Sequence, residues 1–393
     1  MNFLGYPREN GTYGVRNYVA VMSSVICANG PVEEISRQVP DVLPLTHTHG
    51  CGPTGEITLR TLAGIGKNPN IAALLIIGLG CEESTADEIA EEVAKSGKPV
   101  EYLVIQKDGG TAEVVKKGIS IVQRMLKEAG KKERVEVPLE HLIVGLECGG
   151  SDAFSGISAN PAVGVAADLL IAEGGTAIIS EISEMVGTSH ILKRRALNDE
   201  VARKIEAYVA LGTEAANWKS NKSEAGAIAP GNVAGGLTNI VEKSLGCIAK
   251  GGSSTITDCI PYAMSPKTKG LVIMETAGYD IESMAGMVAG GAQLVIFTTG
   301  RGSPAGFALA PVIKVVSNST TFYNQPGDFD INAGTIVDGE KTVKEVGEEI
   351  FKLLIEVANG KETRAEINKQ RQFAIRQEGF HWPTLKDIAE KRL

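Results

Sequence analysis

Short apolar runs that break off into glycine recur along this 393-residue chain, and this pattern constrains its fold most strongly. The run 71–77 leads into a Gly-Leu-Gly turn before Cys81, and the run 142–146 leads to Cys148 and two glycines. Uncharged runs of this length are typical of strands buried in a parallel sheet. Because open α/β sheets bind ligands at the carboxyl ends of their strands, the polar residues after these runs predict a functional site.

Strand-like and helix-like segments alternate along the chain, which predicts an α/β fold with mainly parallel sheets and flanking helices. We expect strands over 18–26, 43–45, 72–79, 100–105, 142–146, 175–180, 270–274 and 292–298. We expect helices over 31–38, 56–64, 84–96 (with Ser84 as N-cap), 111–129, 160–173, 189–211, 237–250 and 343–358.

The chain is longer than one ordinary hydrophobic core, so we expect two lobes. Composition shifts place them at 1–135 and 136–393, with a sub-boundary near 220–235. The active site is expected at the carboxyl ends of the strands, between the lobes.

The charge and the apolar content exclude several classes of protein. A net charge of −8 with no basic stripe argues against nucleic-acid partners. No apolar run reaches the roughly 18 residues of a membrane helix, and no signal segment opens the sequence, so we expect a cytoplasmic protein without a membrane partner. In that compartment the six cysteines are reduced, which favours metal-binding or catalytic roles over disulfides.

Soft metal ligands gather at three of the predicted strand ends. His47, His49 and Cys51 alternate, so an extended segment directs their side chains to one face. Cys81 and Cys148 follow the two apolar runs described above. Imidazole and thiolate suit iron or zinc, whereas the alternative is a loop whose histidines bond backbone carbonyls. Three thiolates also suit an iron–sulfur cluster, and spacing does not separate that from a single ion.

Glycine-rich loops with polar side chains suggest where an anion binds. The loop 149–156 carries Ser151, Asp152 and Ser155 before a predicted helix, and backbone N–H groups there suit a carboxylate. Arg301 lies between two glycines at a strand end, where it can bind a carboxylate through two hydrogen bonds.

A second glycine-rich stretch, 231–236, precedes Lys243. Lys243 suits a general base or a carboxylate clamp, and the alternative is a surface lysine paired with Glu242.

About ten motifs follow one another in an order that resembles a known family. They are Arg8-Glu-Asn-Gly, Gly14-Val-Arg-Asn, His47 to Gly52, Arg60-Thr-Leu-Ala-Gly, Gly78-Leu-Gly-Cys-Glu, Glu147-Cys-Gly-Gly-Ser-Asp, Asn160-Pro, Ser180-Glu with Glu184, Gly231-Asn-Val-Ala-Gly-Gly-Leu-Thr, Glu242-Lys-Ser-Leu-Gly, Gly278-Tyr-Asp and Phe297-Thr-Thr-Gly-Arg-Gly-Ser. Through them the chain resembles the large catalytic part of the altronate/galactarate dehydratase family.

The resemblance implies a lyase that removes water from a sugar acid, such as altronate or galactarate, and gives a 2-keto-3-deoxy acid with the help of Fe²⁺ or Mn²⁺. The family also includes the large subunit of (2R)-sulfolactate sulfo-lyase, which releases sulfite and pyruvate. Family members often carry an N-terminal SAF domain, and this chain opens almost at the Arg8 motif. We therefore expect that the SAF domain is absent or, as we favour, is a separate small subunit. We also expect a homo-oligomer. Asn68-Pro-Asn also replaces the family's His-Pro-Asn, which weakens any role there.

Elimination needs a base, stabilisation of the enediolate and help for the leaving group. We expect His49, Cys51, Cys81 and Cys148 to hold the metal, with His47 as a ligand or proton donor. Lys243 or Asp152 is the expected base. The expected substrate-binding residues are Arg301, Ser151, Ser155, Asn232 and Lys250. The competing hypothesis is a non-catalytic sugar-acid-binding subunit, which would retain neither iron nor manganese.

Overall fold

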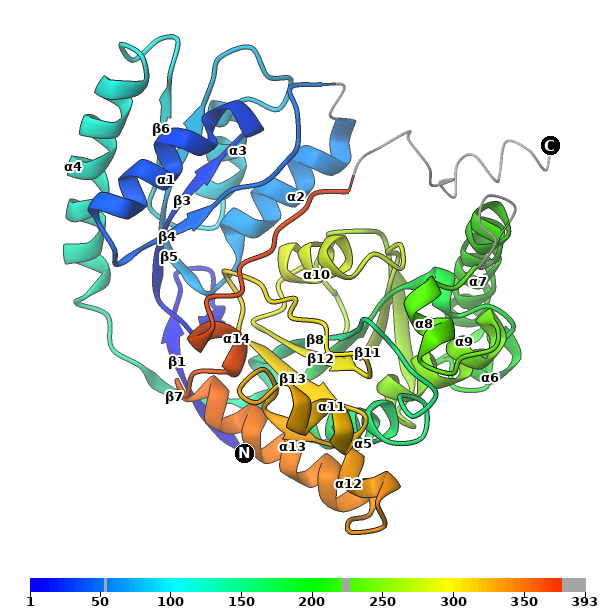
Figure 1. Cartoon of the computed structure of the whole chain (residues 1–393). Helices are drawn as coiled ribbons and strands as arrows, with labels where there is room; N and C mark the ends of the chain where they lie inside the picture. The colour runs from blue at the N-terminus through cyan, green and yellow to red at the C-terminus, as the bar shows by residue number, and fades with distance from the viewer. Residues whose placement is uncertain (53–54, 221–226, 377–393) are drawn as a thin grey trace.

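The computed structural model describes residues 1–52, 55–220 and 227–376, and it divides them among three sheets (Figure 1). Two of the sheets are parallel and are flanked by helices, so the predicted α/β class is confirmed. Among the described residues no helix is long and apolar enough to cross a membrane. The expected sub-boundary near 220–235 falls partly on 221–226, which lie outside the described residues.

The smaller parallel sheet is built from the N-terminal region, with strand order β4-β3-β5-β6. Its strands are β3 (Tyr18–Ser23), β4 (Val42–Leu45), β5 (Ile71–Gly78) and β6 (Val100–Val104). Its helices are α1 (Asn29–Gln38), α2 (Gly55–Lys67), α3 (Ala86–Ala94) and α4 (Thr111–Ala129). Helices α1 and α4 bury one face of the sheet in a hydrophobic cluster. Helices α2 and α3 cover the other face.

The larger parallel sheet has the strand order β10-β11-β9-β8-β12-β13-β14. Its strands are β8 (Ile143–Cys148), β9 (Thr176–Ile179), β10 (Ile256–Ile260), β11 (Gly270–Met274), β12 (Leu294–Thr299), β13 (Val312–Val316) and β14 (Ile331–Asn332). Its helices are α5 (Ala159–Ala172), α6 (Ser189–Lys193), α7 (Asp199–Ser220), α8 (Pro230–Ala234), α9 (Ile240–Ile248), α10 (Asp280–Ala289), α11 (Ser319–Asn324), α12 (Gly334–Val337), α13 (Val343–Ala358) and α14 (Arg364–Ile367).

The two parallel sheets share a hydrophobic core. Residues of the small sheet and of the large sheet belong to one buried cluster, in which α2 packs against α10. The two helices approach so closely at Gly64 that an added Cβ would lie 2.6 Å from the Ala289 carbonyl oxygen. A small antiparallel sheet of β1 (Asn2–Pro7), β2 (Tyr13–Gly14) and β7 (Val135–Pro138) lies where the chain passes from one lobe to the other.

The described C-terminal segment also joins the lobes, because it runs from α14 back toward α2 (Figure 1). On this path the Phe373 ring contacts the rings of His47 and Phe307, with centroids 5.7 and 5.6 Å apart. Arg376 forms an ion pair with Glu275 at 3.1 Å. These contacts fix the small-sheet loop that carries His47 against the larger lobe.

Most expected elements are confirmed, and the exceptions have physical causes. Thr85, not Ser84, caps α3, since its side chain accepts from the Glu88 N–H in a capping box. The helix expected over 189–211 is two helices, α6 and α7. Helix α10 and strand β13 were not expected, although both are largely buried.

Candidate active site

The order in which strands are added to the large sheet reverses at β8, the first strand of that sheet in the sequence. The chain continues from β8 to β9 on one side and later adds β12 on the other, which makes a topological switch point. A cavity of about 450 Å³ opens beyond the carboxyl end of β8. Its lining includes five of the predicted site residues: Cys148, Ser151, Asp152, Ser155 and Lys243.

Asp152 holds the glycine loop that follows β8. One of its oxygens accepts from the Ser155 N–H at 2.8 Å and from the hydroxyls of Ser155 and Ser317 at 2.7 Å each. Its other oxygen accepts from Asn318 Nδ2 at 3.0 Å. The buried Asn232 side chain donates to the Ser151 carbonyl at 3.0 Å. These bonds fix the loop, and they leave the Ser151 hydroxyl, which has no partner among the described residues, beside the cavity.

Arg301 holds the neighbouring loop in place through its backbone. Its N–H donates to the Gly150 carbonyl at 2.8 Å, while its side chain is exposed. The Arg301 side chain is not among the residues that line the cavity.

Buried charges converge behind the cavity. Lys243 and Cys247 lie four residues apart on one face of α9. The Lys243 ammonium forms an ion pair with Glu184, and Glu242 instead accepts from Thr238. The alternative interpretation of Lys243 as a surface lysine paired with Glu242 is therefore wrong.

A second lysine lies deeper in the same cluster. Lys250 is fully buried and its ammonium lies 2.9 Å from the Glu181 carboxylate, which is also fully buried. The Cys148 thiol lies 3.3 Å from Glu181 and 3.8 Å from Glu184. Lys250, expected to contact substrate, thus neutralises an internal carboxylate in this structure.

The ionisation states in the cluster follow from burial and from neighbouring charges. Burial acts to lower the pKa of Lys243, but the negative charges of Glu184 and Glu181 outweigh it and raise the pKa. Lys243 therefore stays protonated at neutral pH and fits a carboxylate clamp better than a base. A hydrogen bond with Cys247 and burial raise the pKa of Cys148, so it carries a proton in the absence of a metal.

Glu147 and Glu181 form a carboxyl pair beneath the cluster. Burial and the Glu181 charge raise the pKa of Glu147 well above its usual range, so Glu147 is protonated. Burial acts to raise the pKa of Glu181 as well, but Lys250 leaves that pKa below its usual value. The proton on Glu147 supplies a donor to Glu181, and Glu147 also accepts from the Ser283 hydroxyl at 2.6 Å.

Glu181 has a backbone conformation that non-glycine residues rarely adopt. Its φ is 64° and its ψ is 55°, in the left-handed region. Its N–H donates to the Thr276 hydroxyl at 2.6 Å, which helps to hold this conformation. Strain of this kind collects at functional sites, where the surrounding structure enforces it.

Asp280, at the start of α10, completes the acidic cluster. A carboxylate oxygen of Asp280 lies within 4.8 Å of oxygens of Glu147 and Glu181. Its side chain also leaves no room for a Cβ at Gly149. Burial, with the charges of Glu181 and Glu184, raises the pKa of Asp280 to about 7.

The small sheet places two histidines after the end of β4, and three of their four ring nitrogens have partners within the fold. His47 Nε2 lies 2.9 Å from the Ser23 carbonyl, and His47 Nδ1 accepts from the His49 N–H at 3.2 Å. Burial lowers the pKa of His47 to about 4, so the ring is neutral. His49 Nε2 lies 3.2 Å from the Thr58 hydroxyl, whereas its buried Nδ1 has no partner among the described residues.

The cysteines of the small-sheet loops are exposed. A backbone hydrogen bond of 3.1 Å from Glu83 to Cys51 joins the loop after β4 to the loop after β5, which carries Cys81. Glu82 accepts from the Ser24 hydroxyl at 2.6 Å and from backbone N–H groups of its own turn. These bonds shape the loop and occupy the carboxylate.

Two groups of potential metal ligands are found among the described residues, and both belong to the larger lobe. The donor atoms within each group all lie within 4.8 Å of one another: Cys148, Glu181, Glu184 and Cys247 in the first, and Glu147, Glu181 and Asp280 in the second. Of the four predicted ligands only Cys148 belongs to either group. The structure does not assemble His49, Cys51 and Cys81 with it in such a group.

Four members of the cluster had no predicted role: Glu181, Glu184, Cys247 and Asp280. Three of them are acidic residues in the ordered motifs, which is the signal that could have identified them. Cys247 carries no such signal, because a cysteine on an apolar helix face is ordinarily a core residue.

Comparisons with known proteins connect this geometry to a family. Residues 5–130 match the family described as D-galactarate dehydratase/altronate hydrolase, second domain, and residues 139–381 match D-galactarate/altronate dehydratase, C-terminal. The chain is 35% identical over 393 residues to an altronate dehydratase of Bacillus subtilis (strain 168), in an alignment that covers 96% of this chain and 78% of that protein.

Two further relatives are similar at the same level. Galactarate dehydratase (L-threo-forming) of Escherichia coli (strain K12) is 36% identical, with 91% of this chain and 73% of that protein covered. (2R)-sulfolactate sulfo-lyase subunit beta of Chromohalobacter salexigens is 32% identical, with 95% and 96% covered. This chain therefore belongs to the altronate/galactarate dehydratase family of lyases, as its ordered motifs predict.

Proposed function

We propose that this lyase is a metal-dependent hydro-lyase that eliminates water from a sugar acid of the altronate or galactarate type. The observation that carries the proposal is the cavity at the end of β8, where the Lys243 ammonium and the Cys148 thiol meet a glycine loop. Ammonium and backbone N–H groups bind a carboxylate, and the polar lining suits a polyhydroxylated chain. Two of the relatives described above carry the names of enzymes with this chemistry.

The reaction removes a proton from the carbon next to the carboxylate and expels the hydroxyl group on the following carbon as water. The enol that forms rearranges to a 2-keto-3-deoxy acid. Negative charge grows on the carboxylate during proton removal, so a fixed ammonium beside it stabilises the transition state. Lys243 fits this role because Glu184 holds it in place and its pKa is raised.

Asp280 is the proposed proton acceptor. Glu147, Glu181 and Glu184 are buried, whereas Asp280 is partly exposed at the edge of the same cluster, outside the lining of the β8 cavity. Asp152, the expected alternative to Lys243, accepts four hydrogen bonds that hold the loop. We assign Asp152 a positioning role together with Asn232, while Ser151 and Ser155 remain the proposed contacts with substrate. Arg301 remains a proposed contact from the exposed side.

The proposed cofactor is Fe²⁺ or Mn²⁺, and the donor set of the larger lobe suits such an ion. Two thiols and two carboxylates, from Cys148, Cys247, Glu181 and Glu184, lie close enough to share one ion. Soft sulfur and hard oxygen donors together suit a borderline metal. When bound, the ion supplies a Lewis acid for the carboxylate or the leaving hydroxyl. His49, Cys51 and Cys81 remain the alternative set, with the unpartnered Nδ1 of His49 in its favour.

A second candidate is sulfite elimination from (2R)-sulfolactate. The relative with that name is 32% identical, near the 35% and 36% of the dehydratases, so identity does not separate the substrates. An ammonium beside a carboxylate serves both reactions, because both start with removal of the same kind of proton. We also propose a small SAF-domain subunit as partner and a homo-oligomeric assembly, in keeping with the word subunit in that relative's name.

The test is a substrate panel on anaerobically purified protein loaded with Fe²⁺ or Mn²⁺. Aldonates, aldarates and sulfolactate are assayed in parallel for keto acid and for sulfite, with and without the small subunit. Keto acid from an aldonate or aldarate without sulfite is the expected result. Sulfite from sulfolactate alone would establish the second candidate instead. Turnover of none of them, by protein that retains its metal, contradicts both.

A further inference from the structure

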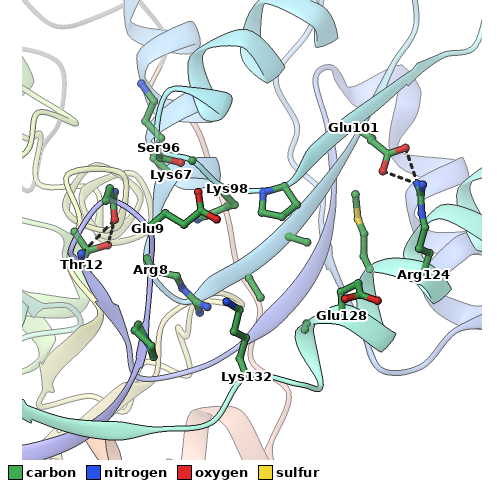
Figure 2. A pocket seen from close by; sticks show the side chains of 18 residues that line it. Arg8, Glu9, Thr12, Lys67, Ser96, Lys98, Glu101, Arg124, Glu128 and Lys132 are labelled. Atoms are coloured by element: carbon green, nitrogen blue, oxygen red, sulfur yellow. Dashed lines mark hydrogen bonds and ion pairs between the residues drawn. The ribbon is translucent and has the colours of Figure 1, made fainter.

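A second cavity lies at the edge of the small sheet opposite the strand-end loops. It has a volume of about 580 Å³ and is bounded by the residues after β1, the start of β5, the start of β6 and the end of α4 (Figure 2). Strand β5 has eight residues, so its two ends lie about 25 Å apart. This cavity is therefore separate from the carboxyl ends of the small-sheet strands. It also shares no lining residue with the proposed active-site cavity.

Two cations at the floor of this cavity are bonded only to neutral oxygens. Lys98 is 9% exposed, and its ammonium donates to the carbonyls of Gly66 at 2.8 Å and Asn68 at 2.6 Å. Those carbonyls lie at the C-terminal end of α2, where the helix dipole is negative and offsets part of the positive charge of Lys98. Arg8 donates to the Pro69 carbonyl at 2.7 Å and to two further neutral oxygens.

The carboxylates that line the cavity do not neutralise these two cations. Four lining residues form ion pairs: Arg124 and Glu101 pair with each other, Lys67 pairs with Glu92, and Glu128 pairs with Lys131. Among the described residues no carboxylate forms an ion pair with the other three cations of the lining, which are Arg8, Lys98 and Lys132. Glu9 is the one lining carboxylate that forms no ion pair with another described residue. Its side chain is exposed and lies next to Gly97.

The cavity also offers an apolar wall beside the cations. Pro7, Ala72, Ala73, Pro99 and Met125 contribute it, between the end of β1, the two strand starts and α4. Figure 2 shows the Arg8 and Lys132 side chains entering the space from different elements. A bare inorganic ion would leave this wall in contact with water, so an anion with a carbon skeleton fits the lining better.

We propose that this cavity is a binding site for a small organic anion with at least two negative charges, distinct from the catalytic cavity. Buried charges in proteins are ordinarily paired, and here the missing partner is an anion that enters from solvent. Burial and the charge of Arg8 lower the pKa of Lys98, and burial lowers the pKa of Arg8 to about 10. A bound anion would act against both shifts, because it stabilises the charged forms of the two side chains.

The test is titration calorimetry of the full-length protein at fixed ionic strength. Citrate probes a polycarboxylate and pyrophosphate probes a phosphate ligand, so the two arms distinguish the sources of charge. We expect at least one of them to bind with one site per chain. Lys132 is exposed, so Lys132→Glu leaves the fold intact and should weaken binding about tenfold or more.

The matched control is Lys116→Glu, the same charge reversal at an exposed position of α4 outside the cavity. It should bind like the wild type, and so should Lys243→Met, which changes a residue of the catalytic cavity and none of this one and is used after urea denaturation has shown it to be folded. Absence of binding by both probes overturns the proposal. Equal weakening by Lys116→Glu, or loss of binding in Lys243→Met, overturns it as well, because the anion would then respond to overall charge or occupy the catalytic cavity.

Discussion

The loops at the carboxyl ends of the two parallel sheets use their polar side chains in opposite ways. In the small sheet, His47 and Glu82 bond mainly to backbone groups of their own loops. In the large sheet, Cys148, Glu181 and Lys250 contact one another's side chains in a fully buried cluster. The hydrogen bonds of the small sheet hold loops in shape, whereas the cluster of the large sheet places buried charged groups beside a cavity.

This difference supports the proposal that the large sheet carries the chemistry. A polar side chain that bonds backbone groups has fewer hydrogen-bonding positions left for a substrate. Buried charges that depend on one another shift each other's pKa, and such shifts cluster at functional sites. The left-handed backbone of Glu181 adds a second mark of function to the large sheet. The four predictions below test this contrast.

The largest expected effect comes from Lys243→Met. Loss of the ammonium removes the proposed carboxylate clamp, and we expect turnover of the sugar acid to fall by about 10³-fold or more, as for other preorganised charges in active sites. Steady-state kinetics on the best substrate of the panel measure the loss. Retention of turnover to within a factor of about ten, roughly 1.4 kcal/mol, would contradict the clamp.

The same substitution leaves Glu184 buried without its partner, which costs about 3–5 kcal/mol of folding stability. The double variant Lys243→Met/Glu184→Gln serves as the control. It should regain most of the lost stability in urea denaturation but none of the turnover. Recovery of turnover along with stability would show that Lys243 acts only through the fold.

In the small sheet the expected effect is on stability rather than on turnover. His47 is neutral in the fold, where burial lowers its pKa from 6.5 to about 4. Because the folded pKa lies below the unfolded one, this stability is fully present above pH 6.5 and is lost as the pH falls toward 4. The loss amounts to at most about 3 kcal/mol.

Urea denaturation between pH 7.5 and pH 4.5 measures this loss, with His47→Gln as the variant that cannot titrate. The wild type should lose more stability on acidification than the variant does. Parallel curves would mean that His47 carries its proton in the fold, and the contrast between the two sheets would then weaken.

Much of the fold follows from local signals in the sequence. The apolar runs at β5 and β8 are long and uncharged, and both strands lie within a residue or two of the predicted ranges. Helix α4 spans Thr111–Ala129 as predicted, because its apolar positions recur with helical spacing. Helix α10 is buried against α2, so its sequence lacks the polar face on which a helix is recognised.

From the sequence, only those site residues that directly follow the same strand could be predicted to lie together. Cys148 and the loop up to Ser155 follow one strand directly, and they line one cavity. Glu181 follows β9, Asp280 follows β11 and Lys243 lies on α9, so only the strand order β11-β9-β8 and the packing of α9 bring them together. The prediction that joined Cys81 to Cys148 rested on two strand ends that belong to different sheets.

The glycine of each loop gives a smaller test of the same contrast. At Gly149 an added Cβ would overlap the Asp280 carboxylate and lie 2.6 Å from the Phe297 ring, whereas at Gly50 nothing lies within 4 Å. We expect Gly149→Ala to cost about 2 kcal/mol of unfolding free energy, as overpacking does, and Gly50→Ala to be nearly neutral. Urea denaturation compares the two, and a neutral Gly149→Ala would show that Asp280 moves freely.

The smallest effect, and the one that separates the two sheets most directly, concerns the metal. If the ion lies in the large sheet, Cys148→Ser removes one ligand and lowers iron or manganese content about tenfold under anaerobic purification, within the range known for altered metal sites. Cys81→Ser changes an exposed side chain of the small sheet and should leave the content unchanged. The reverse result would move the ion to His49, Cys51 and Cys81. Equal losses in both variants would mean that one ion or cluster joins the two sheets, as the sequence alone predicts.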